Sequence, residues 1–266
     1  MNERCGMLCK EVIDKLEGAF PPYYGESWDN IGLLSGRMDK EIQKVYIALD
    51  ATDQTIERAV EGKADFMLTH HPFIFSPLKK VQAHDFIGRR LIHLIQNDIC
   101  YYAMHTNFDV LAMADLAGDI LHLQNKKVLG VMYEEEDSHK GIGCYGYLPK
   151  PITLEECCHF VKKAFTLDWV KVFGNEEKMV RTAAIVPGSG KSFIKKALEA
   201  KVDVLITGDM DHHEGIDALL QGLCIIDGGH YGLEYCFVPY MKQFFEKEMK
   251  GLEVDMEQRT SPFRIL

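Results

Sequence analysis

Two stretches of the chain, AVEGKADFMLT at residues 59–69 and ALEAKVDVLIT at residues 197–207, decide the fold. They share Ala, Glu, Lys, Asp and Thr at the same positions in one ungapped register. Each begins in the last turn of an amphipathic helical pattern and ends in an apolar run with the length of a buried strand. The chain therefore contains an internal repeat, which predicts two related structural units.

An apolar strand pattern precedes the helix in each copy. Residues 45–50 (VYIALD) lead into a helix that Gly62 can end, and residues 183–186 (AAIV) lead through a Pro-Gly turn into the second helix. A strand, a helix and a second strand form a βαβ unit with parallel strands. We expect an α/β fold with two related βαβ-containing lobes and a ligand site in the crevice that the carboxyl ends of their strands face.

The remaining patterns define the extent of the lobes. They predict a third strand of the first half at 101–105. In the second half they predict a strand at 141–147, a helix at 154–165 and a strand at 169–173. We place the lobe boundary near residues 123–128. This gives an N-terminal α/β lobe of residues 1–125 and a second α/β lobe of residues 126–266 within one overall unit.

Composition and charge restrict the class of protein. The 266 residues are 47% hydrophobic and 26% charged, as in ordinary globular proteins, and the eight cysteines show no C-x-x-C spacing. The net charge of -10 gives no general attraction to nucleic acid or to anionic membranes. No stretch reaches the roughly 18 apolar residues of a membrane span, and the N-terminus is charged where a signal peptide would be apolar. We expect a cytoplasmic protein with reduced thiols.

Five side chains of metal-binding type fall at the ends of predicted strands or just beyond them. Neutral imidazole and carboxylate suit Zn, Fe, Mn or Ni, and one carboxylate can bridge two cations about 3.5 to 4 Å apart. Five protein ligands leave positions open for water, which is typical of a catalytic or exchangeable site. We therefore predict a pair of divalent metal ions held by His70, His71, Asp109, His230 and Glu234.

The local sequence restricts how these ligands are presented. Adjacent histidines on a strand point to opposite faces, so His70 and His71 can serve one cluster only where the strand ends. Pro72 favours such an end because it interrupts strand hydrogen bonding. The i, i+4 spacing of His230 and Glu234 places them on one face of a short helical turn.

A glycine-rich stretch, GSGKS at 188–192, is similar to a phosphate-binding loop because it turns from a strand into a helix. A complete Walker motif needs Gly at position 185, where this chain has Ile185. We therefore interpret the stretch as a tight turn between a strand and a helix.

Other polar residues near these strand ends have two interpretations each. His105 and His213 are candidates for proton transfer beside the metal ions, or they cap helices and lie at the surface. The segment Trp28–Asn30 either lines a cavity or packs a loop, and Asp50 has the same two interpretations.

Several blocks of sequence also occur in the order typical of one family, and they span almost the whole chain. They are SWDNIGLLSG (27–36), THHPFIF (69–75), HTNFD (105–109), TGD (207–209) and DGGHY (227–231) followed by Glu234. These blocks resemble the NIF3-like family, whose members are also described as GTP cyclohydrolase I type 2 homologues. Relatives often carry Gly-Glu where this chain has Gly208 and Asp209, a departure that leaves the predicted ligands unchanged.

The resemblance implies a NIF3-like fold and a division of the ligands between two metal ions. His71 and Asp109 would hold one ion, His70 and His230 would hold the other, and Glu234 would bridge both. The resemblance also implies a toroidal homohexamer.

For function, the resemblance implies a metal-dependent hydrolase in which activated water attacks a nucleotide or a related phosphorylated substrate. The sequence shows no motif for guanine recognition. The second hypothesis is therefore a non-enzymatic hexamer with a metal-binding, metal-delivery or regulatory role.

Overall fold

The computed structural model describes residues 6–136 and 138–265, which form two compact units. The first unit contains the described residues up to Phe108 together with Phe237–Arg259. The second contains Asp109–Cys236 together with the described residues from Thr260 onward. The chain thus passes between the units three times. The bounds of these units differ from the two lobes, residues 1–125 and 126–266, that the sequence predicts. The division into two related lobes stays a prediction.

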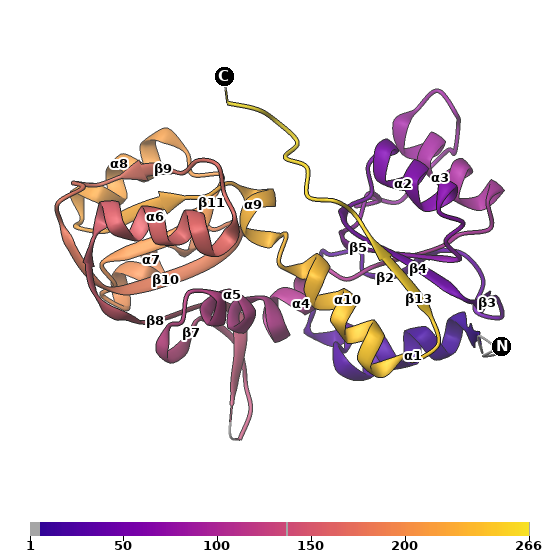
Figure 1. Cartoon of the computed structure of the whole chain (residues 1–266), viewed down its shortest axis with the longest axis horizontal. Helices are drawn as coiled ribbons and strands as arrows, with labels where there is room; N and C mark the ends of the chain where they lie inside the picture. Colours follow the sequence, from indigo (N-terminus) through magenta and orange to yellow (C-terminus); the bar gives the residue numbers. More distant parts are fainter. Residues whose placement is uncertain (1–5, 137, 266) are drawn as a thin grey trace. The chain divides into compact units, whose positions relative to one another are not determined.

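The first unit is built on a five-stranded sheet with the strand order β13-β4-β5-β6-β2. Strands β13, β4, β5 and β6 are parallel, and β2 is antiparallel to β6. Helices α2 and α3 cover one face of the sheet and helices α1 and α10 cover the other (Figure 1). The elements are β1 (Met7–Leu8), α1 (Cys9–Ala19), η1 (Pro22–Tyr24), β2 (Gly32–Ser35), β3 (Glu41–Ile42), β4 (Lys44–Asp50), α2 (Asp53–Glu61), β5 (Phe66–His71), α3 (Phe86–Gln96), β6 (Cys100–Ala103), α4 (Thr106–Phe108), α10 (Phe237–Glu248) and β13 (Glu253–Met256).

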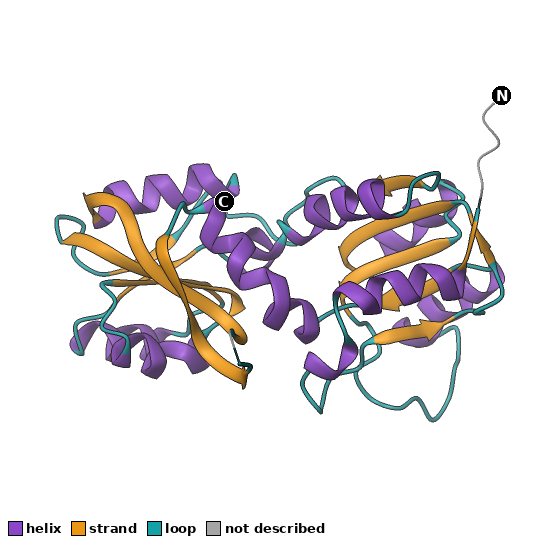
Figure 2. Cartoon of the chain, turned by 90° about the horizontal axis from the view of Figure 1, so that it is seen from below, coloured by secondary structure: helices purple, strands orange, loops and turns teal. Residues whose placement is uncertain are grey.

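The second unit is built on a six-stranded sheet with the strand order β7-β8-β10-β11-β12-β9. Strands β10, β11 and β12 are parallel, and the other pairings are antiparallel. Helices lie on both faces of this sheet (Figure 2), with α5, α6 and α9 on one face and α7 and α8 on the other. The elements are η2 (Asp109–Met113), α5 (Ala114–Ile120), β7 (Gln124–Glu134), β8 (His139–Thr153), α6 (Leu154–Phe165), β9 (Lys171–Phe173), β10 (Met179–Ser189), η3 (Lys191–Phe193), α7 (Ile194–Glu199), β11 (Val204–Gly208), α8 (His212–Leu220), β12 (Cys224–Asp227) and α9 (His230–Glu234).

The described helices are short. The longest, α6 and α10, have 12 residues each. Among the residues that the structure describes, no helix has both the length and the apolar character required to cross a membrane.

Both predicted βαβ units are present, as β4-α2-β5 and β10-α7-β11. The two copies of the repeat also share backbone detail that the sequence identity alone does not show. Lys63 and Lys201 occupy the same position of the repeat, and both have left-handed backbone conformations, with φ of 56° and 54°. Each ends its helix, because a left-handed residue stops helix propagation and turns the chain toward the next strand.

The shared aspartate of the repeat, Asp65 in the first copy and Asp203 in the second, fixes the start of the βαβ unit. One carboxylate oxygen of each accepts hydrogen bonds from two consecutive backbone N–H groups in the preceding strand or directly before it. Burial raises the pKa of Asp203, but these hydrogen bonds outweigh it and hold the pKa below its ordinary value. The donors are Gln43 and Lys44 at 2.9 Å in the first copy and Arg181 and Thr182 at 2.8 and 2.9 Å in the second.

One part of the second sheet was not predicted. We placed a lobe boundary near residues 123–128, where the structure has the start of β7, which pairs with β8 in a long hairpin. The run QNKKV at residues 124–128 is polar because one face of β7 is exposed, and a half-exposed strand at the sheet edge gives a weak apolar signal. The helical spacing of residues 5–16 also predicts a helix at the N-terminus; α1 begins at Cys9, and Cys5 lies outside the described residues.

We expect Asp65→Ala and Asp203→Ala each to lower the free energy of unfolding by about 1–3 kcal/mol, because each leaves two backbone N–H groups without their acceptor. Urea unfolding followed by tryptophan fluorescence measures this effect. The two tryptophans, Trp28 and Trp169, lie in different units. A Trp169→Phe background therefore reports the first unit and a Trp28→Phe background reports the second.

The control is Asp39→Ala, whose side chain is 82% exposed. It should change the unfolding free energy by less than about 0.5 kcal/mol. Equal effects of Asp39→Ala and the two repeat variants would contradict the structural role that we assign to the shared aspartate.

Candidate metal centre

Three histidine side chains of the first unit converge where β5 and β6 end. His70 and His71 are the last two residues of β5, and His105 follows β6. The register pairs Thr69 with Ala103, so both strands reach the same edge of the sheet. One ring nitrogen of each histidine lies within 4.8 Å of one from each of the other two. Three imidazole nitrogens at such distances can together coordinate a metal ion.

Each of these imidazoles is oriented through its Nδ1 atom by an oxygen acceptor. An acceptor at Nδ1 favours the tautomer with its proton there, and the lone pair then lies on Nε2, the nitrogen that can bind a metal. The three contacts are His70 to the Met104 carbonyl at 2.9 Å, His71 to Asp50 Oδ1 at 2.9 Å and His105 to Asp29 Oδ1 at 3.0 Å.

Asp29 both packs a loop and orients a histidine, the two roles that the sequence left open for its segment. Its side chain is fully buried, and it accepts hydrogen bonds from His105 Nδ1 and from the N–H and hydroxyl groups of Thr106 at 3.0 and 2.6 Å. Burial alone would raise the pKa of Asp29, but the hydrogen bonds from His105 and Thr106 lower it to about 2. Asp29 therefore carries a negative charge beside His105 at neutral pH.

Asp50 has an equally specific position. It lies opposite His71 in the register between β4 and β5, so its carboxylate reaches the imidazole directly. The hydroxyl groups of Thr69 and Tyr101 both donate to the His71 carbonyl, at 2.8 and 3.2 Å. These contacts replace strand pairing immediately before Pro72 and fix the place where β5 ends.

A second set of ligand-type residues lies in the second unit, on the short helix α9. His230 Nε2 and Glu234 Oε2 are 3.0 Å apart across one helical turn, as the i, i+4 spacing predicts. The Glu234 side chain is almost fully buried. Asp209, in a left-handed conformation with φ of 55°, contacts His230 Nδ1 at 2.7 Å. His230 is therefore oriented through Nδ1 like the three histidines of the first unit.

The glycine-rich segment 188–190, where β10 ends and the chain turns, packs against this pair. Gly188 has φ of +77°, and a Cβ atom there would lie 2.2 Å from Glu234 Oε1 and 3.5 Å from His230 Nε2. The Thr207 hydroxyl accepts from the N–H of Gly190 at 2.9 Å and donates to the carbonyl of Gly188 at 3.2 Å, which holds the turn in place. Glycine at 188 is thus required by close approach to Glu234, a role that the sequence did not reveal.

The remaining predicted residues lie in the second unit. Asp109 begins η2, a single π-helical segment, and is partly buried. His213 is exposed on α8, where its ring lies 5.1 Å from that of His212. Lys191, in the stretch that is similar to a phosphate-binding loop, forms an ion pair with Asp211 at 2.8 Å.

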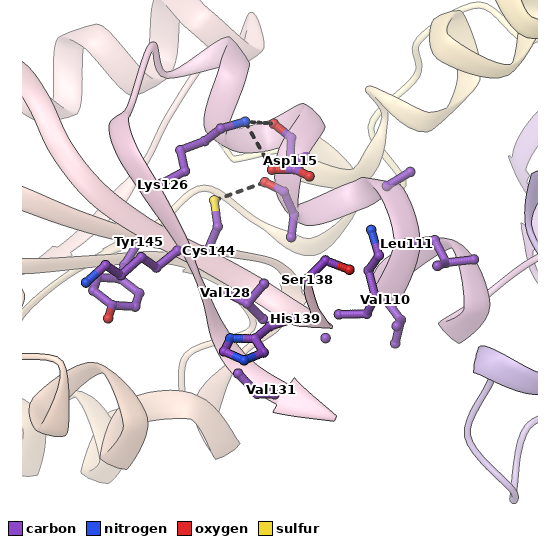
Figure 3. A pocket seen from close by; sticks show the side chains of 15 residues that line it. Val110, Leu111, Asp115, Lys126, Val128, Val131, Ser138, His139, Cys144 and Tyr145 are labelled. Carbon is purple, nitrogen blue, oxygen red and sulfur yellow. Dashed lines mark hydrogen bonds and ion pairs between the residues drawn. The ribbon is translucent and has the colours of Figure 1, made fainter. Parts of the chain in front are cut away.

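A cavity of about 680 Å³ lies elsewhere in the second unit, between the segment η2–α5 and the hairpin β7–β8 (Figure 3). Lys126 is ion-paired there with Asp115 at 3.1 Å, and the Cys144 thiol donates to the Ala114 carbonyl at 3.0 Å (Figure 3). None of the described residues that line it is a predicted metal ligand.

Comparison with known proteins adds independent information. The family model of Duf34/NIF3 (NGG1p interacting factor 3) matches residues 7–262. A Streptococcus pneumoniae protein named GTP cyclohydrolase 1 type 2 homolog is 35% identical over an alignment of 268 positions, and the match covers 97% of this chain and 99% of that protein. A Clostridium perfringens protein of the same name is 33% identical over 255 residues, covering 94% and 95% of the two chains.

The fold is also shared with a solved structure. The crystal structure of a Bacillus cereus protein related to NIF3 matches with a TM-score of 0.90 at 23% sequence identity. The match covers 98% of this chain and 99% of that chain.

We expect Gly188→Ala to reduce metal binding, because the added Cβ cannot fit beside Glu234 without moving that carboxylate. The control is Gly222→Ala, which has φ of +92° but open space around the added atom. Both variants should lose about 1–2 kcal/mol of stability from the left-handed backbone. Only Gly188→Ala should lose metal in elemental analysis after reconstitution. Full metal content in both variants would show that Glu234 is not a ligand or that the turn moves freely.

Proposed function

This chain is a member of the Duf34/NIF3 family, and on that premise we propose that it is a metal-dependent hydrolase with two divalent ions per chain. The observation that carries the proposal is the shared orientation of His70, His71 and His230 through Nδ1, which favours the tautomer whose Nε2 lone pair can bind a metal ion.

The donor set fits divalent transition metals. Imidazole nitrogens together with a buried carboxylate suit Zn, Fe, Mn or Ni, and two such ions supply the Lewis acidity that activates water and stabilises negative charge. Following the family pattern, we assign His71 and Asp109 to one ion, His70 and His230 to the other, and Glu234 to both.

The connectivity of the chain supports joint use of the two ligand sets. Asp109 follows His105 by four residues, so their Cα atoms can be at most about 14 Å apart. Glu234 precedes Phe237 by three residues, which limits that separation to about 11 Å. The Phe237 ring in turn packs at 5.0 Å from the ring of His70. The chain thus links both carboxylate ligands to the histidine cluster over a few residues.

His105 is suited to move a proton. Its Nδ1 is held by Asp29, whose pKa of about 2 keeps it ionised. A carboxylate in this position stabilises the imidazolium that forms when Nε2 accepts a proton. We therefore assign proton transfer to His105 in preference to His213, which lies exposed on α8.

The proposed substrate is a small nucleotide or a related phosphorylated compound. Its support is the name GTP cyclohydrolase 1 type 2 homolog that relatives at 33–35% identity carry. We further propose a cytoplasmic homohexamer, following the family resemblance. The alternative is a non-enzymatic hexamer that binds, delivers or senses metal, and turnover distinguishes the two.

We expect elemental analysis of the reconstituted protein to find about two divalent ions per chain, and no more than about one in Glu234→Ala, because a bridging carboxylate serves both ions. The matched control is Glu199→Ala, an exposed helical glutamate whose only described ion pair is with Lys195 at 3.9 Å. It should retain both ions.

The same three proteins should then be assayed on GTP and other nucleotides. Turnover by the parent and by Glu199→Ala, but not by Glu234→Ala, supports the hydrolase. Two tightly bound ions without turnover of any nucleotide support the non-enzymatic alternative. A parent that binds no metal after reconstitution rules out both.

A further inference from the structure

Two large aromatic side chains of the first unit lie exposed beside the histidine cluster. Trp28 is 61% exposed and Phe75 is 54% exposed. The centroid of the Trp28 ring lies 6.0 Å from that of His105, with 74° between the ring planes. The corresponding values for Phe75 are 6.4 Å and 80°. Both rings therefore meet the His105 imidazole edge to face while much of their surface stays in solvent.

The loops that carry these rings are held firmly by buried neighbours. Asp29, next to Trp28, is fully buried against His105 and Thr106. Phe73 and Ile74, next to Phe75, are also buried. The amide group of Asn30 donates to the Ile74 carbonyl at 2.5 Å and so ties the two loops together. These contacts fix the backbone directly after Trp28 and directly before Phe75 without burying the rings.

A ligand that covered the rings would gain free energy by removing their apolar surface from water. An aromatic side chain can bury about 150–250 Å², and burial contributes about 25 cal/mol per Å² of apolar surface. A planar ring is the ligand group that gains most from two such side chains, because stacking uses its whole face. Because both rings contact the His105 imidazole, a ring that stacks on them lies next to the group that we assign to proton transfer.

We infer that Trp28 and Phe75 form a stacking site for the planar heteroaromatic ring of the substrate, such as a nucleobase. This inference rests on the proposed function and deepens it, because the ring, in addition to any phosphate, selects the substrate. The two aromatic residues position the substrate, and His105 and the metal ligands act on it.

The chain offers a direct spectroscopic test because it contains only two tryptophans. In a Trp169→Phe background, Trp28 is the only source of tryptophan emission. Titration of the metal-loaded protein with GTP should quench this emission, whereas inorganic triphosphate, which lacks a ring, should not. The dissociation constant for GTP is then measured by calorimetry in the wild-type background.

Loss of either ring should weaken GTP binding about tenfold, which corresponds to about 1.4 kcal/mol of stacking. Trp28→Leu and Phe75→Ala test this, and Trp28→Phe should restore most of the affinity because it keeps an aromatic face. The control is Phe86→Ala, which removes a ring of the same unit that is 52% exposed and lies under Arg90. It should leave the affinity unchanged. Metal content and the unfolding midpoint of each variant show that the fold is intact.

The outcomes separate this inference from the proposed hydrolase. Ring-dependent quenching without turnover of any nucleotide supports the stacking site and argues against the hydrolase. Turnover with the same KM in Trp28→Leu and Phe75→Ala as in the parent overturns the stacking site and leaves the hydrolase standing. Emission of ligand-free Trp28 that shifts to the blue as protein concentration rises, with no quenching by GTP, would show that a second copy covers the rings and would also overturn the inference.

Discussion

Parallel pairing of β4, β5 and β6 is the constraint on which the histidine cluster depends. Their carboxyl ends reach one edge of the sheet, and the register sets Asp50 opposite His71 and Thr69 opposite Ala103. Ligand-type side chains and their hydrogen-bonding partners therefore come from three neighbouring strand ends. A slip of β5 by one residue would turn its side chains to the opposite face and separate His71 from Asp50.

The second unit uses the same βαβ frame for different chemistry. The position of His70 in the first copy is occupied by Gly208 in the second, and the position of His71 by Asp209. A Cβ atom at Gly208 would lie 2.5 Å from the backbone nitrogen of His230, so the missing side chain allows α9 to approach. The Asp209 carboxylate then orients the His230 imidazole through its Nδ1 atom. One copy presents imidazoles from its strand end, and the other presents a partner for an imidazole on the following helix.

The sequence predicted the elements whose signals are local. The predicted helix at 154–165 has the bounds of α6. The sequence also predicts that a strand ends at the His-His pair and that a short helical turn carries His230 and Glu234. These features depend on periodicity, capping and proline within a few residues. The α/β class and the two βαβ units followed from the repeat for the same reason.

The contacts that refine the site could not be predicted in this way. Asp29 and His105 are 76 positions apart, and nothing in the pattern around Trp28 distinguishes a packed loop from a histidine partner. The approach of Gly188 to Glu234 likewise depends on how a turn after one strand meets a helix after another. The membership of α10 and β13 in the first unit also depends on packing between distant segments, to which local periodicity is insensitive.

The position of β13 has a consequence for how the protein is made. This strand comes from the last part of the chain, pairs with β4 in parallel, and is followed by Glu257, whose carboxylate accepts from the backbone N–H of Leu49 at 2.8 Å, 208 positions earlier. Strand β4 leaves the ribosome about 200 residues before β13, so this edge of the sheet is completed long after β4 has been made. Until then, β4 is an open edge strand that can pair with another chain. One edge of the sheet is therefore unpaired while about 200 further residues are synthesised.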